Sequence, residues 1–96
     1  MASSLVQYVV VRGDLLKQKS WNLGALIAQA CHASTAVIHL FYQESDTQAY
    51  LADLNNMHKV VLEAKDEEQL KALGQQLTEA DIDHKMWVEQ PENYPT

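Results

Sequence analysis

Short apolar runs alternate along this chain with longer segments whose apolar residues recur every three or four positions. Leu5 to Val11 is a short run rich in valine. A run of this length is too short for a stable helix and is typical of a buried strand. Arg12-Gly13-Asp14 predicts the turn that ends it. His58 to Ala64 predicts a second strand, and His84 to Glu89 predicts a third.

The longest segment with helical spacing follows the first strand. Asn22 is a good N-cap, and the helix is expected to run to about Gln43. Its apolar residues fall on one side, as in a helix that packs on a sheet. The residues expected to face the sheet are Leu26, Ile27, Ala30, Ser34, Val37, Ile38 and Phe41.

Two further helices are predicted in the second half of the chain. Ser45 or Asp46 can cap a short helix, and Asp66 with Gln69 forms a plausible capping box for a longer one. The short helix should bury Tyr50, Leu51 and Leu54, and the longer one carries Leu70, Leu73 and Leu77 on one face.

This order, β-α-α-β-α-β, predicts an α/β domain with a small mixed, partly parallel sheet flanked by helices. Strands separated by helices need crossover connections, which place them parallel. Ninety-six residues are enough for one domain, covering residues 1–96. Phosphate-bearing ligands in such folds bind beyond the strand ends near helix N-termini. Here that region is the loop from Arg12 to Asn22.

Composition places the protein among ordinary globular proteins of a reducing compartment. The chain is 47% hydrophobic and 21% charged. One cysteine cannot form an internal disulfide, which favours the cytoplasm. The first residues lack the basic flank of a secretory signal. We expect no apolar run of the roughly 18 residues that span a bilayer, and therefore no membrane partner.

The charges are unevenly distributed. The net charge of −6 is the wrong sign for a general phosphate binder. Residues 1–42, however, carry Arg12, Lys17 and Lys19 against Asp14, a balance of +2, whereas residues 43–96 carry four lysines against twelve acids, a balance of −8. A polyanion should therefore meet the N-terminal third. Scattered surface charge is the alternative explanation.

A second face of the long helix is polar but uncharged. Ala25, Gln29, His32, Ala36 and His39 fall together at 100° per residue. They are expected to lie opposite the apolar stripe. No Asp, Glu, Lys or Arg occurs from Leu23 to Tyr42. Such a face is expected either to be covered by another element or to form a groove for a ligand.

Several kinds of chemistry are not supported by the sequence. Cys31 and His32 are adjacent, so their side chains diverge by about 100° around a helix and cannot form a nucleophile–base pair. The four histidines show no metal-ligand spacing, and the three glycines are too dispersed for a phosphate loop. We therefore expect no metal site.

Three motifs extend this interpretation. They are Val9-Val10-Val11-Arg12-x-Asp14-Leu15, then Gly24-x-x-Ile27/Ala28-Gln29-x-x-His32-Ala33, then Lys59-Val60-Val61-Leu62-x-Ala64-x-Asp66-Glu67. In this order and spacing the chain resembles the type-II peptidyl-tRNA hydrolases of archaea and eukaryotes. Gln90-Pro91-Glu92-Asn93 resembles the divergent branch of peptidyl-tRNA hydrolase domain-containing proteins.

The resemblance implies a function in translation. The family has a four-stranded mixed sheet and hydrolyses, without a cofactor, the ester that links a peptide to the 3′ end of tRNA. Gln29 and His32 match its motif outright, and Thr96 matches a threonine at the start of its fourth strand. Peptidyl-tRNA is thus the expected partner, with Arg12, Lys17 and Lys19 on the side that would hold its phosphates.

The chain departs from the family pattern at two positions. Ala25 stands where the family has a lysine, and Gln90 or Pro91 where it has an aspartate. Either other groups such as His32, Lys17, Glu89 and Glu92 take over, or the protein binds tRNA or a protein partner without efficient turnover. Family members continue beyond Thr96, so the last strand and helix are expected to be absent, and dimerisation through the open strand edge is possible.

Overall fold

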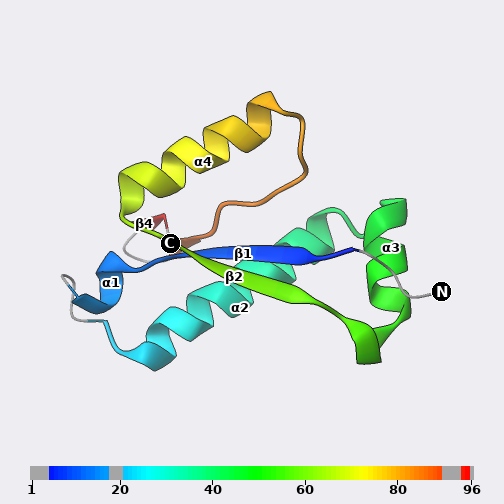
Figure 1. Cartoon of the computed structure of the whole chain (residues 1–96), viewed down its shortest axis with the longest axis horizontal. Coiled ribbons are helices and arrows are strands. Elements are labelled where there is room, and N and C mark those ends of the chain that lie inside the picture. Colours follow the sequence, from blue (N-terminus) through cyan, green and yellow to red (C-terminus); the bar gives the residue numbers. More distant parts are fainter. Residues whose placement is uncertain (1–4, 18–20, 90–93, 96) are drawn as a thin grey trace.

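The computed structural model describes residues 5–17, 21–89 and 94–95, and Figure 1 shows the arrangement of their helices and strands. The elements in chain order are β1 (Gln7–Arg12), α1 (Asp14–Lys17), α2 (Leu23–Leu40), α3 (Ser45–Ala52), η1 (Leu54–Asn56), β2 (Lys59–Ala64), α4 (Glu67–Glu79), β3 (Val88–Glu89) and β4 (Tyr94–Pro95).

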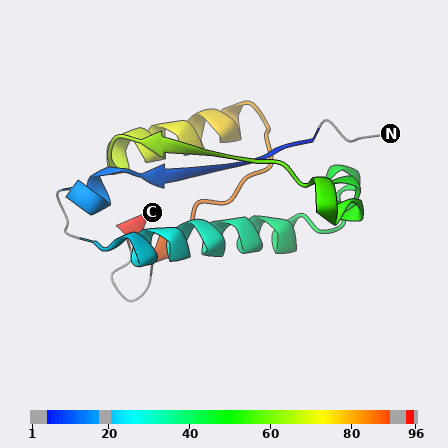
Figure 2. The same cartoon turned by 60° about the horizontal axis from the view of Figure 1, so that its bottom comes forward.

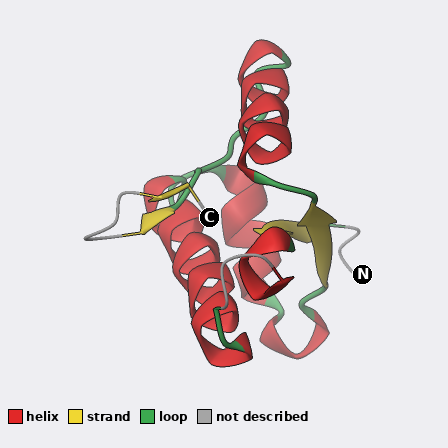
Figure 3. Cartoon of the chain, turned by 90° about the vertical axis from the view of Figure 1, so that its left-hand side faces the viewer, coloured by secondary structure: helices red, strands yellow, loops and turns green. Residues whose placement is uncertain are grey.

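The central feature is a parallel pair of strands. β1 and β2 pair in register from Gln7 with Lys59 to Arg12 with Ala64, and the crossover between them contains α1, α2 and α3. The predicted α/β class and parallel pairing are therefore confirmed. β3 and β4 form a separate antiparallel pair, which lies apart from β1 and β2 (Figure 3).

Two helices cover the strand pair from opposite sides. α2 packs along β1 on one side, and α4 lies on the other (Figures 1 and 2). α3 stands at the amino ends of the strands, where the Tyr50 hydroxyl donates to the His58 carbonyl oxygen at 3.0 Å. The core contains few apolar side chains, and among the described residues Leu15 is the one that is fully buried. Its other members are Val9, Leu26, Tyr50, Ala64 and Leu70.

The helix starts follow the predicted caps. Asn22 Oδ1 accepts from the Ala25 N–H at 2.7 Å, and Asp66 Oδ1 accepts from the Gln69 N–H at 2.9 Å. These bonds satisfy amide groups that the first turn leaves without a helical partner. The Gln69 side chain reaches back one residue further than a capping box requires and accepts from the Lys65 N–H.

Four details differ from the sequence-based expectations. α1 is an additional single turn, and β3 is shorter than the predicted strand. Glu44 precedes α3 as its N-cap, without a side-chain hydrogen bond, in place of Ser45 or Asp46. Leu54 is 66% exposed because α3 ends at Ala52 and Leu54 begins the separate turn η1.

The inward face of α2 is also rotated relative to the prediction. Leu26 and Gln29 are its two buried residues, whereas Ile27 is 53% exposed. Gln29 lies about 60° from Leu26 around the helix, and Ile27 lies 100° away in the other direction. The buried strip is therefore centred between the predicted apolar stripe and the predicted polar face.

α2 also corrects the expectation about membrane-spanning segments. By length and composition, its 18 residues are apolar enough to cross a bilayer, with a mean hydropathy of 1.4. The helix has no Asp, Glu, Lys or Arg, which raises this value. One such helix is weak support for a membrane protein, because core helices of globular proteins meet the same criterion.

Candidate functional site

Gln29 is the buried polar residue of α2, with 3% of its surface exposed. Its side-chain Nε2 donates to the carbonyl oxygen of Ala25, one turn earlier, at 3.3 Å. Its Oε1 accepts a hydrogen bond from the indole Nε1–H of Trp87 at 2.9 Å. The carboxamide therefore points into the protein and is covered by Trp87, which agrees with one of the two outcomes expected for the uncharged face of α2, cover by another element.

His32 lies at the edge of the same contact. Its exposed imidazole stacks on the Trp87 ring, with the ring centroids 4.8 Å apart and the planes inclined by 24°. Gln29, His32 and Trp87 thus form one cluster, which we call the α2–Trp87 cluster. Sequence reasoning had already grouped Gln29 with His32, but it had not assigned Trp87 to the same site.

Trp87 could not be assigned to this site from the sequence. It lies 58 residues after Gln29, in the segment before β3. This segment leaves the end of α4 and returns toward α2 (Figure 2). The uncharged face of α2 was the one available signal, because it predicted cover by another element without naming the element.

A large groove borders this cluster. It has a volume of about 850 Å³ and lies between β1, α2, α4 and residues 81–87. Its walls are largely apolar, including Val9, Val37 and Leu73, and Trp87 is one of its lining residues. Gln29 and His32 contact Trp87 but do not line the groove. Trp87 is therefore the member of the α2–Trp87 cluster that lines the groove.

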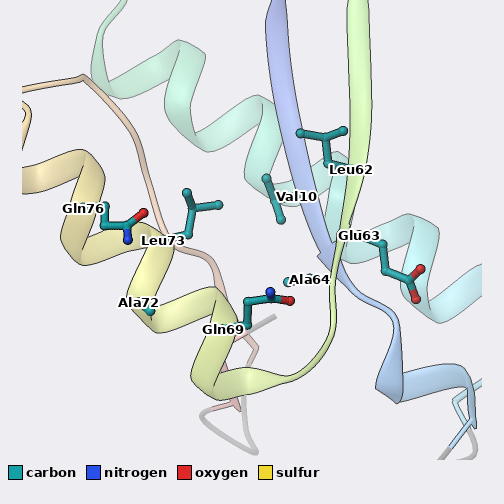
Figure 4. A pocket seen from close by; sticks show the side chains of 8 residues that line it. All are labelled: Val10, Leu62, Glu63, Ala64, Gln69, Ala72, Leu73 and Gln76. Carbon is teal, nitrogen blue, oxygen red and sulfur yellow. The ribbon is translucent and has the colours of Figure 1, made fainter.

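A second cavity lies between α4 and the strand pair. Figure 4 shows its eight lining side chains, which enclose about 430 Å³. Glu63 is the charged member of the set, and Gln69 and Gln76 are the amides. The described lining residues include no histidine, cysteine or basic side chain, so they offer little for acid–base catalysis or phosphate binding.

Arg12 occupies a different position from the one its phosphate-binding prediction requires. Its side chain is 4% exposed and forms a two-pronged ion pair with the buried Asp14, at 3.0 Å from Nε to Oδ1 and 2.7 Å from Nη2 to Oδ2. Glu67 lies 3.4 Å from Nη1. The bonds to Asp14, above all, raise the pKa of Arg12 further. This charge is already balanced inside the protein.

The other basic residues are placed as follows. Lys17 is exposed in the last turn of α1, as a phosphate contact would require. Lys19, Gln90, Pro91 and Thr96 lie outside the described residues. Within the described part of the chain, no three His, Cys, Asp or Glu side chains gather as a metal site.

A polar network lies at the amino ends of β1 and β2. The Ser34 hydroxyl donates to Gln7 Oε1 at 3.0 Å, and Gln7 Nε2 donates back to the Ser34 carbonyl oxygen at 3.2 Å. The Lys59 ammonium also donates to Gln7 Oε1 and lies 5.4 Å from the centre of the Tyr50 ring. This network ties α2, α3 and both strands together, which is a structural role.

Comparison with known proteins gives a consistent result. The family model described as "Peptidyl-tRNA hydrolase PTH2" matches residues 5–96. A mouse and a human protein, both named "Putative peptidyl-tRNA hydrolase PTRHD1", are 55% and 54% identical over 93 residues. These matches cover 96% of this chain and 66% of each relative. No solved structure matches. The chain belongs to the PTH2 family of peptidyl-tRNA hydrolases.

Proposed function

We propose that this protein is a peptidyl-tRNA hydrolase, which cleaves the ester between a peptide, or an N-blocked amino acid, and tRNA. The observation that carries the proposal is the α2–Trp87 cluster. Two residues that match the family motif, Gln29 and His32, share one aromatic partner there. Trp87 buries the first of them and stacks on the exposed ring of the second.

The proposed roles follow from what ester hydrolysis requires. Water must be oriented at the ester carbonyl, a proton must be moved, and the oxyanion must be stabilised. The exposed imidazole of His32 can accept a proton from water. The Gln29 carboxamide, bonded to Trp87 and to the Ala25 carbonyl oxygen, is proposed as a buried polar group beside it. Thr96, which matches a family threonine, is proposed as a third polar group of the site.

The proposed tRNA contacts lie N-terminal to α2. Lys17 and Lys19 can contact acceptor-stem phosphates, since backbone contacts by lysine supply much of nucleic-acid affinity. Arg12 was predicted to contact phosphates together with these lysines. We propose instead that it contributes to tRNA binding indirectly. Its ion pair with Asp14 holds the start of α1, the turn on which Lys17 lies.

The alternative proposal is a family member that binds tRNA or a protein partner without efficient turnover. It is favoured by Ala25, which stands where the family has lysine. Ala25 precedes Gln29 by one turn, and its carbonyl oxygen accepts from the Gln29 amide. A lysine there would add a charge beside the cluster. Without that lysine and the aspartate expected at Gln90 or Pro91, the site has lost two charged groups.

Release of free tRNA from a defined N-acetyl-aminoacyl-tRNA distinguishes these proposals. We expect release above the spontaneous rate, and a loss of at least about 10²-fold in His32→Ala, the usual size of an acid–base contribution. Cys31→Ser, an exposed change on the same helix, is the control and should act like wild type. Retention of labelled tRNA at low salt without release would overturn the hydrolase proposal in favour of binding.

A gain-of-function variant tests the departures from the family pattern. The double change Ala25→Lys, Gln90→Asp restores both charged groups. If their loss limits turnover, this variant should release tRNA faster than wild type. Equal rates would show that other groups of this branch do the work of the missing pair.

We further propose that the protein works in the cytoplasm, in translation, without a membrane, and that it can form a homodimer through an open strand edge. Support for the cytoplasm is the tRNA substrate of the family together with the single cysteine. Fractionation of tagged protein tests it. Recovery of the protein in the membrane pellet after a salt wash would contradict this proposal and point to α2.

A further inference from the structure

The turn at the end of α4 and the segment after it place Trp87 against α2. α4 ends in a Schellman turn, in which the Ile82 N–H donates to the Leu77 carbonyl at 2.9 Å and Asp81 adopts φ 58°. The chain then runs back from α4 toward α2 (Figures 1 and 2). At Gly74 a Cβ atom would come within 2.7 Å of the Met86 terminal methyl group. Met86 therefore lies close on α4, directly before Trp87.

The hydrogen bond from Trp87 fixes the orientation of the Gln29 amide. An indole N–H can only donate, so the carboxamide atom that faces it must be the oxygen. The nitrogen then points to the other side, where Nε2 donates to the Ala25 carbonyl oxygen. A carboxamide rotated by 180° would place N–H against N–H. Trp87 thus selects one of the two orientations of this side chain.

The same ring restricts His32. The imidazole stacks on the indole at 4.8 Å, which limits the directions in which its two nitrogens can point. Stacked aromatic pairs are stabilised beyond the burial of their area. One side chain therefore holds both motif residues, one by a hydrogen bond and the other by its face.

We propose that Trp87 is a positioning residue of this site, which sets the amide orientation of Gln29 and the ring orientation of His32. This inference rests on the proposed hydrolase function. Trp87 acts through the two motif residues and is not assigned any contact with substrate. Small misplacements of catalytic groups reduce the rate strongly while binding is less affected.

The activity test uses Trp87→Phe, which keeps a ring for the stack and removes the N–H donor. We expect kcat for release of tRNA to fall by about tenfold while KM stays within about twofold. Trp87→Ala, which removes the stack as well, should fall further. His39→Gln, a histidine change elsewhere on α2, is the control. Unchanged kcat in Trp87→Phe would overturn the proposal. Faster release would also overturn it, and would show that Trp87 covers the site.

A second readout does not depend on activity. The protein has two tryptophans, so Trp21→Phe leaves Trp87 as the sole indole emitter. An imidazole stacked on an indole alters its fluorescence emission. His32→Gln should therefore change the emission of Trp87 at constant pH, while His39→Gln should leave it as in the parent protein. Unchanged emission in His32→Gln would overturn the positioning of His32.

The two readouts separate the possible failures. If wild-type protein releases no tRNA, the proposed function fails and the catalytic meaning of Trp87 fails with it, whatever the fluorescence shows. If wild type is active but the stack is not detected, the proposed function stands and the positioning role is overturned.

Discussion

The guanidinium of Arg12 is the most constrained charged group at the carboxyl end of β1. It is paired with Asp14, whose side chain is 6% exposed, and with the half-exposed Glu67. Burying two charges is costly, and their mutual attraction with good geometry offsets that cost. Removing one partner leaves the other charge buried alone. Substituting Arg12 or Asp14 alone should therefore lower the stability of the protein far more than the location of the pair near a surface turn suggests.

We accordingly expect Arg12→Met to lower the free energy of unfolding by about 3 kcal/mol, the usual size for breaking a buried pair. Urea denaturation measures this change. The matched control is Lys71→Met, which breaks the exposed pair with Glu67 on α4 and should cost far less, because solvent screens exposed pairs. A loss below 1 kcal/mol in Arg12→Met would mean that the guanidinium is accessible to phosphate.

Glu67 leads to a prediction about acid stability. Its hydrogen bond with Lys71, helped by attraction to Lys71 and Arg12, lowers its pKa below the usual value of about 4.5. A carboxylate with a lowered pKa stabilises the folded state fully above that usual value. This contribution is lost as pH falls from there through the folded-state pKa.

Glu67→Gln should therefore flatten the fall in stability below about pH 4.5. Unfolding free energies measured between pH 6 and pH 3 test this expectation. Glu68→Gln, an exposed change in the same turn of α4, is the control. Parallel curves for wild type and Glu67→Gln would contradict the prediction.

Single residues show which parts of the site could be predicted from the sequence. The match of Gln29 and His32 depends on local spacing, which the sequence records directly. The inward direction of Gln29 depends on Trp87, 58 residues away, and no spacing rule reports that contact. Arg12 was predicted as a phosphate ligand because Asp14, two residues later, was counted only as charge. The pairing of these two side chains required the turn at Gly13.

Among the elements, α4 has the most clearly defined ends. Asp66 caps its start by accepting from the Gln69 N–H. Its end is a Schellman turn in which Asp81 has φ 58°, a left-handed conformation that costs a non-glycine residue about 1 kcal/mol or more. Glycine is the usual residue at this position. Asp81 therefore reduces stability where the chain turns back toward the site.

Asp81→Gly should raise the free energy of unfolding by about 0.5–1 kcal/mol, less than the full strain because glycine is also more flexible in the unfolded chain. The midpoint of urea unfolding measures it. Asp83→Gly, an exposed change in the extended segment that follows, is the control and should not stabilise. If Asp81→Gly also destabilised the protein, the left-handed turn would be absent in solution.

The starts of α2 and α4 were easier to predict than β3 for a physical reason. The caps at Asn22 and Asp66 are bonds between residues three apart, so they are readable from sequence. β3 instead depends on pairing with β4, and it extends over Val88–Glu89 alone. A longer strand was predicted over His84 to Glu89, where the alternation is mixed, but the segment before Val88 serves to bring Met86 and Trp87 against the helices.

At the scale of the whole molecule, β2 is the least covered part of the parallel pair. Consecutive strand residues point to opposite faces, yet Val61 is 61% exposed and Leu62 is 49% exposed. Parallel strands are normally buried on both faces. In the described part of the chain, β2 pairs with β1 alone, so its other edge is not occupied by a described strand.

An apolar strand edge of this kind favours association, and natural proteins commonly protect such edges with lysine. If the proposed homodimer forms through β2, sedimentation velocity should show a sedimentation coefficient that rises with protein concentration. Val61→Lys should then shift the protein to monomer, because a charge at the contact must be desolvated. Leu54→Lys, which places lysine at a residue 66% exposed in η1, is the control and should associate like wild type. Equal association by wild type and Val61→Lys would exclude β2 as the contact, and a concentration-independent monomer would contradict the dimer itself.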